Sequence, residues 1–196
     1  MNMQALTKIT STATPLAIEN IDTDQIIPAR FLKSINREGF GDNLFRDWRY
    51  NNDGSEKKDF SLNNPKYAGE ILIAGNNFGC GSSREHAAWA LSDYGFKVIV
   101  SSYFADIFKT NALNNGVLPI MVSKEYLSYL FNEVQNNPNV EIDVDVEQQS
   151  ITVNNQKEHY ELDPYKKICL LNGYDDIDFL IAKKDAIKSF EQTKSY

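Results

Sequence analysis

The residues best suited to chemistry lie in the stretch 76–91, where the sequence reads NNFGCGSSREHAAWAL. Two hydroxyls and a guanidinium stand side by side in it, at Ser82, Ser83 and Arg84. A guanidinium can hold a carboxylate by two parallel hydrogen bonds, and backbone amides at the start of a helix bind anions. The same amides could stabilise an alkoxide, which would let an ordinarily inert serine act as a base. The stretch therefore predicts a site for a carboxylate or a phosphate, with Ser82 as the group that could take a proton.

The surrounding chain predicts a strand, a glycine loop and a helix that together position these groups. Residues 70–74 (EILIA) form an apolar run long enough for a buried strand and too short for a helix. Three glycines interrupt regular structure after it: Gly75, Gly79 and Gly81. Ser82 and Glu85 have the spacing of a capping box, so we expect the helix to begin at Ser82. Gly95 suits the left-handed residue just past the end of that helix.

A simpler interpretation of the stretch stays open. Ser82 could serve only as a cap, with the glycines making a tight turn, because capping boxes are common. Other loop motifs do not match. Arg84 stands where G-x-G-x-x-G requires its third glycine, so a dinucleotide site is not expected. There is no G-K-[ST] for a P-loop and no G-x-S-x-G for a nucleophile elbow.

Two upstream segments carry further polar groups. Residues 22–24 (DTD) lie between apolar residues, as a loop or strand end that either fixes carboxylates beside a core or forms a local turn. Residues 29–64 are rich in arginines, aromatics and Asn, Asp and Gly. They predict either a solvated insertion whose aromatic side chains pack back on the domain, or a mobile segment that closes over substrate.

Downstream, the pattern predicts strands that alternate with helices and therefore pair in parallel. The expected elements are a strand at 96–101, a helix at 103–115, a strand at 117–122 and a helix at 124–135, capped by Ser123. Pro119 suggests that the strand at 117–122 lies at an edge or pairs irregularly.

The last third of the chain has a different character. Strict alternation predicts a half-buried strand at 140–146, followed by short strands at 150–153 and 159–162 in a meander. A helix begins at Asp163-Pro164 and runs to Gly173. Asp175-Asp176 open the final helix. Four residues are expected to form the buried stripe of that helix: Ile177, Leu180, Ile181 and Ile187.

The totals limit the class of protein. With 196 residues, of which 42% are hydrophobic, the chain can bury a core as a single domain over 1–196, with an insertion at about 29–64. A net charge of −7 without a long basic cluster argues against binding nucleic acid. The apolar runs are too short to span a membrane, and the N-terminus lacks the hydrophobic core of a signal peptide. Cys80 and Cys169 form no short-spaced motif, which fits a cytoplasmic protein.

Two motifs carry a resemblance to a known family. Residues 77–87, NFGCGSSREHA, closely resemble the signature of the aconitase swivel-domain superfamily, and residues 21–28, IDTDQIIP, match a second motif upstream. In this order they are similar to the small-subunit family of the bacterial isopropylmalate dehydratases, or isomerases. The resemblance covers most of the chain. It implies an α/β fold of the swivelling β/β/α type, three layers with a mainly parallel central sheet and additional antiparallel strands.

The same resemblance implies a hydro-lyase that interconverts 2-isopropylmalate and 3-isopropylmalate through 2-isopropylmaleate, in leucine biosynthesis. Ser82 would be the catalytic base, acting as an alkoxide held by amides at the helix start. Ser83 and Arg84 would hold a substrate carboxylate, assisted by Arg37. Asp24 would belong to the substrate-binding shell.

Five further residues of the motif are expected to shape the loop rather than to react: Gly79, Cys80, Gly81, Glu85 and His86. Cys80 suits a small buried side chain better than a nucleophile. Glu85 is expected to serve the cap and His86 to pack or orient the loop. Asp22 is a weaker candidate than its neighbour at 24, and Asn111 either shapes the site or packs its helix.

The implied reaction needs more than this chain offers. Expelling hydroxide requires a Lewis acid, which in aconitase-like enzymes is the open iron of a [4Fe-4S] cluster held by three cysteines. Two distant cysteines cannot supply that cluster, and two histidines do not make a convincing zinc site. We therefore expect no metal site or cofactor in this chain and a hetero-oligomer with a large subunit that holds the cluster.

Two alternatives stay open. The chemistry could be the same with another acid, as in the small subunits of homoaconitase or of citraconate/methylmalate dehydratases. The chain could instead be a stand-alone carboxylate- or phosphate-binding module.

Overall fold

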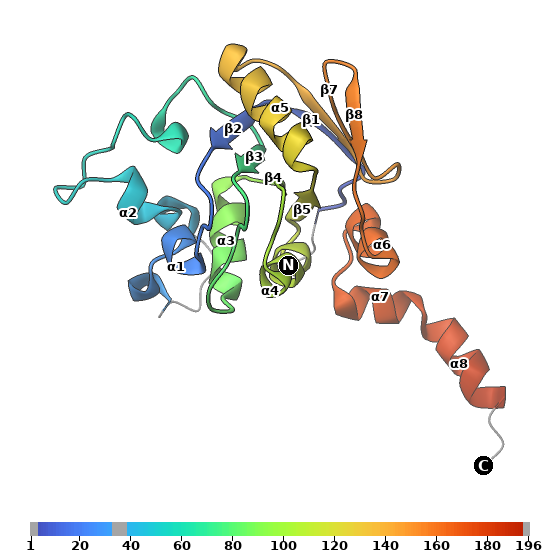
Figure 1. The fold of residues 1–196 in the computed structure, drawn as a ribbon. Coiled ribbons are helices and arrows are strands. Elements are labelled where there is room, and N and C mark those ends of the chain that lie inside the picture. The colour runs from blue at the N-terminus through green and yellow to red at the C-terminus, as the bar shows by residue number, and fades with distance from the viewer. Residues whose placement is uncertain (1–3, 33–38, 194–196) are drawn as a thin grey trace.

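The computed structural model describes residues 4–32 and 39–193 and contains two four-stranded sheets (Figure 1). The parallel sheet has the strand order β2-β3-β4-β5. Its strands are β2 (Ala13–Leu16), β3 (Ile71–Ala74), β4 (Val98–Ser101) and β5 (Leu118–Met121). The expectation of parallel pairing is confirmed.

Both faces of the parallel sheet are buried, which explains why its strands read as unbroken apolar runs. Alternate residues of β3 point into different cores: Ile71 and Ile73 join one, and Leu72 joins the other. The edge strands tolerate proline because an edge residue needs no second ladder bond. Pro15 lies in β2 and Pro119 in β5, as expected for the latter.

The second sheet is antiparallel, with the order β1-β6-β7-β8. Its strands are β1 (Lys8–Ser11), β6 (Ile142–Asp145), β7 (Ser150–Val153) and β8 (Gln156–His159). The prediction of the last strand at 159–162 is wrong by three residues. Asn154 and Asn155 have φ values of 45° and 67°, the conformation of a two-residue hairpin turn, so the chain reverses at once after β7.

Three helices cover the parallel sheet: α3 (Glu85–Tyr94), α4 (Asp106–Asn114) and α5 (Lys124–Asn136). Helix α5 shares a core with both sheets, whereas α3 and α4 share the other core with the insertion. The Ser123 hydroxyl accepts a hydrogen bond from the Tyr126 amide, so the predicted cap of α5 is confirmed. Gly95 ends α3 with a φ of 111°, also as predicted.

The insertion is packed on the body where the structure describes it. Its elements, with the helix before it, are α1 (Thr23–Ile26), η1 (Ala29–Phe31), η2 (Gly41–Asn43), α2 (Arg46–Arg49) and η3 (Ser61–Asn63). Phe40, Leu44 and Phe45 are buried in the core shared with α3. Aromatic side chains of this segment therefore pack back on the domain, as one of the two interpretations predicts.

Three helices form the C-terminal part: α6 (Pro164–Asn172), α7 (Asp176–Ala182) and α8 (Lys184–Thr193). Asp163 caps α6 and Gly173 ends it with a φ of 67°, as predicted. The single final helix predicted from Asp175-Asp176 consists of two helices, α7 and α8, with Lys183 between them, and its predicted buried stripe is also wrong. Four of its residues are exposed: Ile177 (67%), Leu180 (58%), Ile181 (64%) and Ile187 (43%). The reason is visible in Figure 1, where α7 and α8 extend away from both sheets, so no core lies within their reach.

No helix in residues 4–32 or 39–193 is both long and apolar enough to cross a membrane. The single-domain organisation over 1–196 stays a prediction.

Candidate active site

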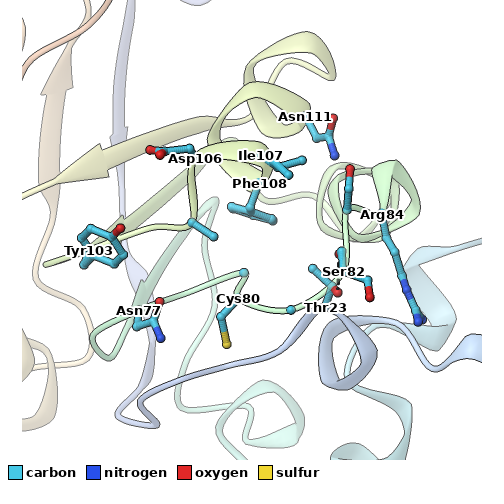
Figure 2. Close-up of a pocket in the computed structure, with 14 residues that line it drawn as sticks. Thr23, Asn77, Cys80, Ser82, Arg84, Tyr103, Asp106, Ile107, Phe108 and Asn111 are labelled. Atoms are coloured by element: carbon cyan, nitrogen blue, oxygen red, sulfur yellow. Dashed lines mark hydrogen bonds between the residues drawn. The ribbon is translucent and has the colours of Figure 1, made fainter.

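The glycine loop follows β3 and lies beside the segment that follows β4, so both reach the carboxyl-end edge of the parallel sheet. Ligands of open α/β sheets bind at such edges. A cavity of about 340 Å³ opens here (Figure 2). Its lining includes the predicted residues Cys80, Ser82, Ser83 and Arg84 and the start of α4.

Helix α3 begins later than predicted. Its N-cap is Arg84, with an extended backbone (φ −137°, ψ 107°), and no side chain caps it. The predicted capping box is therefore wrong, and Glu85 is the first helical residue rather than a cap partner. A tertiary contact accounts for the difference: the Ser82 carbonyl accepts a hydrogen bond from the Thr23 hydroxyl (2.8 Å), which holds Ser82 outside the helix.

Consequently the Ser82 side chain is not used as a cap. Ser82 and Ser83 are both exposed at the mouth of the cavity. Within the described part of the chain the Ser82 hydroxyl has no hydrogen-bond partner. A hydroxyl presented in this way is available to a ligand.

Two glycines let the loop fit between α4 and the segment that precedes α1. Gly79 has a φ of 74°, and a Cβ there would lie 2.2 Å from the ring of Phe108. Gly81 has a φ of 91°, and a Cβ there would lie 2.4 Å from the carboxylate of Asp22. Both positions therefore exclude a side chain by conformation and by space.

The upstream aspartate motif is hydrogen-bonded to this loop. The Gly79 amide donates to the Ile21 carbonyl (2.8 Å), and the Thr23 amide donates to the Cys80 carbonyl (2.9 Å). Asp22 caps α1 and forms a capping box with Gln25. The motif thus belongs to the site by contact, and Asp22 has a structural role there.

Asp24 and Arg84, both predicted to bind substrate, bind each other. The guanidinium makes two hydrogen bonds to the carboxylate, one of them 2.9 Å from Nη2 to Oδ2. The Arg84 side chain is 18% exposed and that of Asp24 50%. In Figure 2 the Arg84 side chain extends away from the wall that carries Tyr103.

The remaining motif residues make ring contacts or hydrogen bonds within the chain. The His86 ring lies 4.5 Å from that of Trp89 and 5.5 Å from that of Phe40, centroid to centroid, which agrees with a packing role. Glu85 accepts a hydrogen bond from Asn115 (3.3 Å). Burial, and then the nearby charge of Asp22, raise the pKa of the Cys80 thiol, so Cys80 is a poor nucleophile at neutral pH.

The described residues do not fit an iron–sulfur cluster. Cys80 lines the cavity, whereas Cys169 is buried and lines a second one. Within residues 4–32 and 39–193, no three His, Cys, Asp or Glu side chains are grouped as metal ligands.

The model of the aconitase C-terminal domain family matches residues 3–125, which include the glycine loop and the aspartate motif. The chain belongs to this family.

Individual relatives are similar to this chain over almost its whole length. The 3-isopropylmalate dehydratase small subunit of Christiangramia forsetii is 58% identical and covers 98% of this chain and 95% of its own length. The small subunit of Cytophaga hutchinsonii is 56% identical and covers 99% of this chain and 98% of its own length. A crystal structure of 3-isopropylmalate dehydratase from Methanocaldococcus jannaschii has a TM-score of 0.66 at 26% identity and covers 94% of this chain and 99% of that one. The resemblance and fold class predicted from the two motifs are confirmed.

Some lining residues of this aconitase-family site were not predicted from the sequence. Tyr103, Asp106 and Ile107 line the cavity from the segment that follows β4, and Asn111, which was considered, also lines it. The sequence could have indicated them, because they follow β4, which pairs in parallel with β3, and the segments after two such strands lie at the same edge of the sheet. Arg37 lies outside the described residues, so its proposed role stays a prediction.

Proposed function

We propose that the chain is the small subunit of a 3-isopropylmalate dehydratase, which together with its large subunit interconverts 2-isopropylmalate and 3-isopropylmalate by dehydration and rehydration, in leucine biosynthesis. The observation that carries the proposal is the exposed Ser82 hydroxyl beside Arg84, in a cavity large enough for a small dicarboxylate. The near full-length similarity to proteins named as that small subunit supports the choice of substrate.

In this proposal Ser82 takes the proton alpha to a substrate carboxylate. A free serine is far too weak a base for that step, so its alkoxide must be stabilised. Helix α3 begins three residues later, and its first amides and macrodipole favour negative charge nearby. The absence of a capping bond leaves the hydroxyl able to turn toward a ligand.

Ser83 and Arg84 would hold a substrate carboxylate. Asp24 occupies one hydrogen on each of the two terminal nitrogens of Arg84, and a guanidinium has five N–H donors in all. Arg84 can therefore bind a second carboxylate while Asp24 fixes its orientation. Arg37 would assist as a further carboxylate ligand.

The rest of the active site would come from the large subunit. A [4Fe-4S] cluster held there would supply the Lewis acid that makes hydroxide a leaving group. The contribution of this chain is the proton acceptor and the carboxylate ligands.

The test is to mix the purified chain with its large subunit under anaerobic conditions and to follow the absorbance of the unsaturated intermediate. We expect turnover only from the mixture, and a preference for isopropylmalate over homoaconitate and methylmalate. Ser82→Ala should lower kcat by at least about 10²-fold, since a positioned base contributes that much, while assembly is retained. Ser128→Ala, on the exposed side of α5, is the control and should behave as wild type.

Three results would contradict the proposal. Turnover by this chain alone would reject a shared site. A near-normal rate for Ser82→Ala would remove the serine from the mechanism. Tight binding of the dicarboxylate without turnover, even with the large subunit present, would favour a stand-alone binding module.

A further inference from the structure

Helices α7 and α8 carry an apolar face that the described part of the chain leaves in contact with solvent. Ile177, Leu180 and Ile181 have the i, i+3, i+4 spacing of one helix face, and each is more than half exposed. Ile187, on α8, is 43% exposed, and we group it with these three residues as the apolar face. Isolated exposed apolar residues are ordinary on protein surfaces, but a contiguous group indicates an interaction site.

The apolar face is held in a fixed direction. Asp176, the first residue of α7, accepts hydrogen bonds from the Tyr165 hydroxyl and from Lys166 Nζ (2.9 Å). Lys166 Nζ also donates to Asn114 at the end of α4 (2.7 Å). The Tyr165 and Phe179 rings meet edge to face, 4.5 Å apart. Helix α7 is therefore attached to α6, and through Lys166 of α6 it is linked to α4.

One face of α4 connects α7 with the Ser82 cavity. Ile107, Asn111 and Asn114 are spaced by four and three residues and so share a face. Ile107 and Asn111 line the Ser82 cavity, and Asn114 lines the second cavity together with Ile177. Seven residues of helix correspond to roughly 10 Å. A protein that covers the Ser82 cavity therefore needs to extend only about that far to reach α7.

The area of the apolar face fits part of a larger interface. Each of its four aliphatic side chains exposes on the order of 100 Å². Together they offer roughly half of the ~800 Å² that each partner buries in a standard interface. A second copy of the chain bound through this face alone would bury too little for a stable dimer. It would also leave the Ser82 cavity open.

We propose that the apolar face of α7 and α8, continued by the exposed face of α4, docks the large subunit that closes the Ser82 cavity. This inference rests on the proposed function. It adds where the large subunit binds: over the start of α4 and outward along the C-terminal helices. Ile107, 55% exposed at the rim of the cavity, would be covered in the same interface.

The test compares Ile181→Glu with Gln192→Glu, which adds the same charge to an exposed position on α8 outside the apolar face. Each full-length variant is titrated with the large subunit under anaerobic conditions, with binding measured by calorimetry and kcat at saturation. Ile181→Glu should raise the Kd at least about tenfold, as burial of a charge in an interface centre does, with kcat at saturation nearly unchanged. Gln192→Glu should leave both constants as in wild type. Circular dichroism should show the same helix content for all three proteins.

Equal Kd values for the two variants would overturn the docking surface while leaving the proposed function intact. If sedimentation shows that wild type self-associates and Ile181→Glu does not, with the same Kd for the large subunit, the face binds a second copy instead. A wild-type chain that neither binds nor activates the large subunit would overturn the proposed function and this inference together.

Discussion

The Arg84 guanidinium is already paired with a carboxylate of its own chain, that of Asp24. Its pairing with Asp24 fixes the plane of the guanidinium, and fixing a long side chain in advance reduces the entropy lost when a ligand binds. Asp24 lies in the first turn of α1, and Thr23 of the same turn donates a hydrogen bond to the Ser82 carbonyl at the end of the glycine loop. The two residues therefore form one unit with the loop that carries Ser82.

The first prediction concerns this ion pair. Asp24→Asn should raise KM for the dicarboxylate about tenfold, because an uncharged amide cannot accept both guanidinium hydrogen bonds and Arg84 becomes mobile. The change in kcat should be smaller, since the proton acceptor is untouched. Steady-state kinetics with saturating large subunit measure both constants. An unchanged or lower KM would show that Asp24 competes with substrate instead of positioning Arg84. Asp47→Asn, which breaks the exposed ion pair with Arg30, is the control and should leave KM unchanged.

At the scale of elements, the turn from β3 into α3 depends on a close contact between Gly79 and α4. Gly79→Ala should lower the free energy of unfolding by about 1–2 kcal/mol for the positive φ, and by roughly 1–3 kcal/mol more for the overlap with Phe108. Gly95→Ala is a matched control, because Gly95 also has a positive φ but nothing lies within 4 Å of its added Cβ. Urea unfolding of both variants measures the difference. Equal destabilisation would mean that the Phe108 ring moves aside without cost.

Elements whose signals are local were predictable, and those that depend on distant contacts were not. The apolar run before the glycine loop predicted β3, and Ser123 predicted the start of α5, because strand burial and capping are written in adjacent residues. The predicted start of α3 was wrong because the spacing of Ser82 and Glu85 does not reveal the hydrogen bond that the Ser82 carbonyl accepts from Thr23.

The site shows the same division. The glycine loop with Ser82 and the upstream aspartate motif were recognised as sequence motifs, at 77–87 and 21–28. The ion pair between Asp24 and Arg84 joins residues 60 positions apart, and only the fold brings them together. The apolar pattern of α7 predicted a buried face, and in the described part of the chain that face is exposed, because an apolar pattern does not say which surface covers it. The exposure of Ile177 is therefore informative about assembly.

At the scale of the whole molecule, the insertion is joined to the layer of α3 and α4, which also lines the Ser82 cavity. The Gly41 amide donates to the side chain of Asp93 near the end of α3 (2.8 Å). The Tyr94 hydroxyl donates to the carbonyl of Leu62 (3.1 Å). Movement of the insertion would therefore also displace α3, the helix that begins beside Ser82.

Arg49 makes the central contacts of this junction. It is 7% exposed, and its guanidinium lies 4.9 Å from the centre of the Tyr94 ring. Its Nε donates to Asn63 Oδ1 (3.1 Å), and Nη1 points to the carbonyls of Gly41 (3.4 Å) and Leu44 (3.3 Å). These contacts connect the segment around Gly41 and Leu44 with the segment around Asn63, and the ring contact with Tyr94 connects both with α3.

The last prediction is that Arg49→Met loosens the insertion selectively. Losing hydrogen bonds from a buried charged donor, and leaving carbonyls without partners, should cost about 2–3 kcal/mol. Amide hydrogen exchange in residues 40–63 should accelerate roughly 30- to 100-fold, since each ~1.4 kcal/mol is a factor of ten, while amides of β3 and β4 keep their protection. Arg30→Met is the control, because Arg30 forms an exposed ion pair whose loss costs at most about 1 kcal/mol. Uniform acceleration across the whole chain would mean that Arg49 supports the global fold and that the insertion does not open as a separate unit.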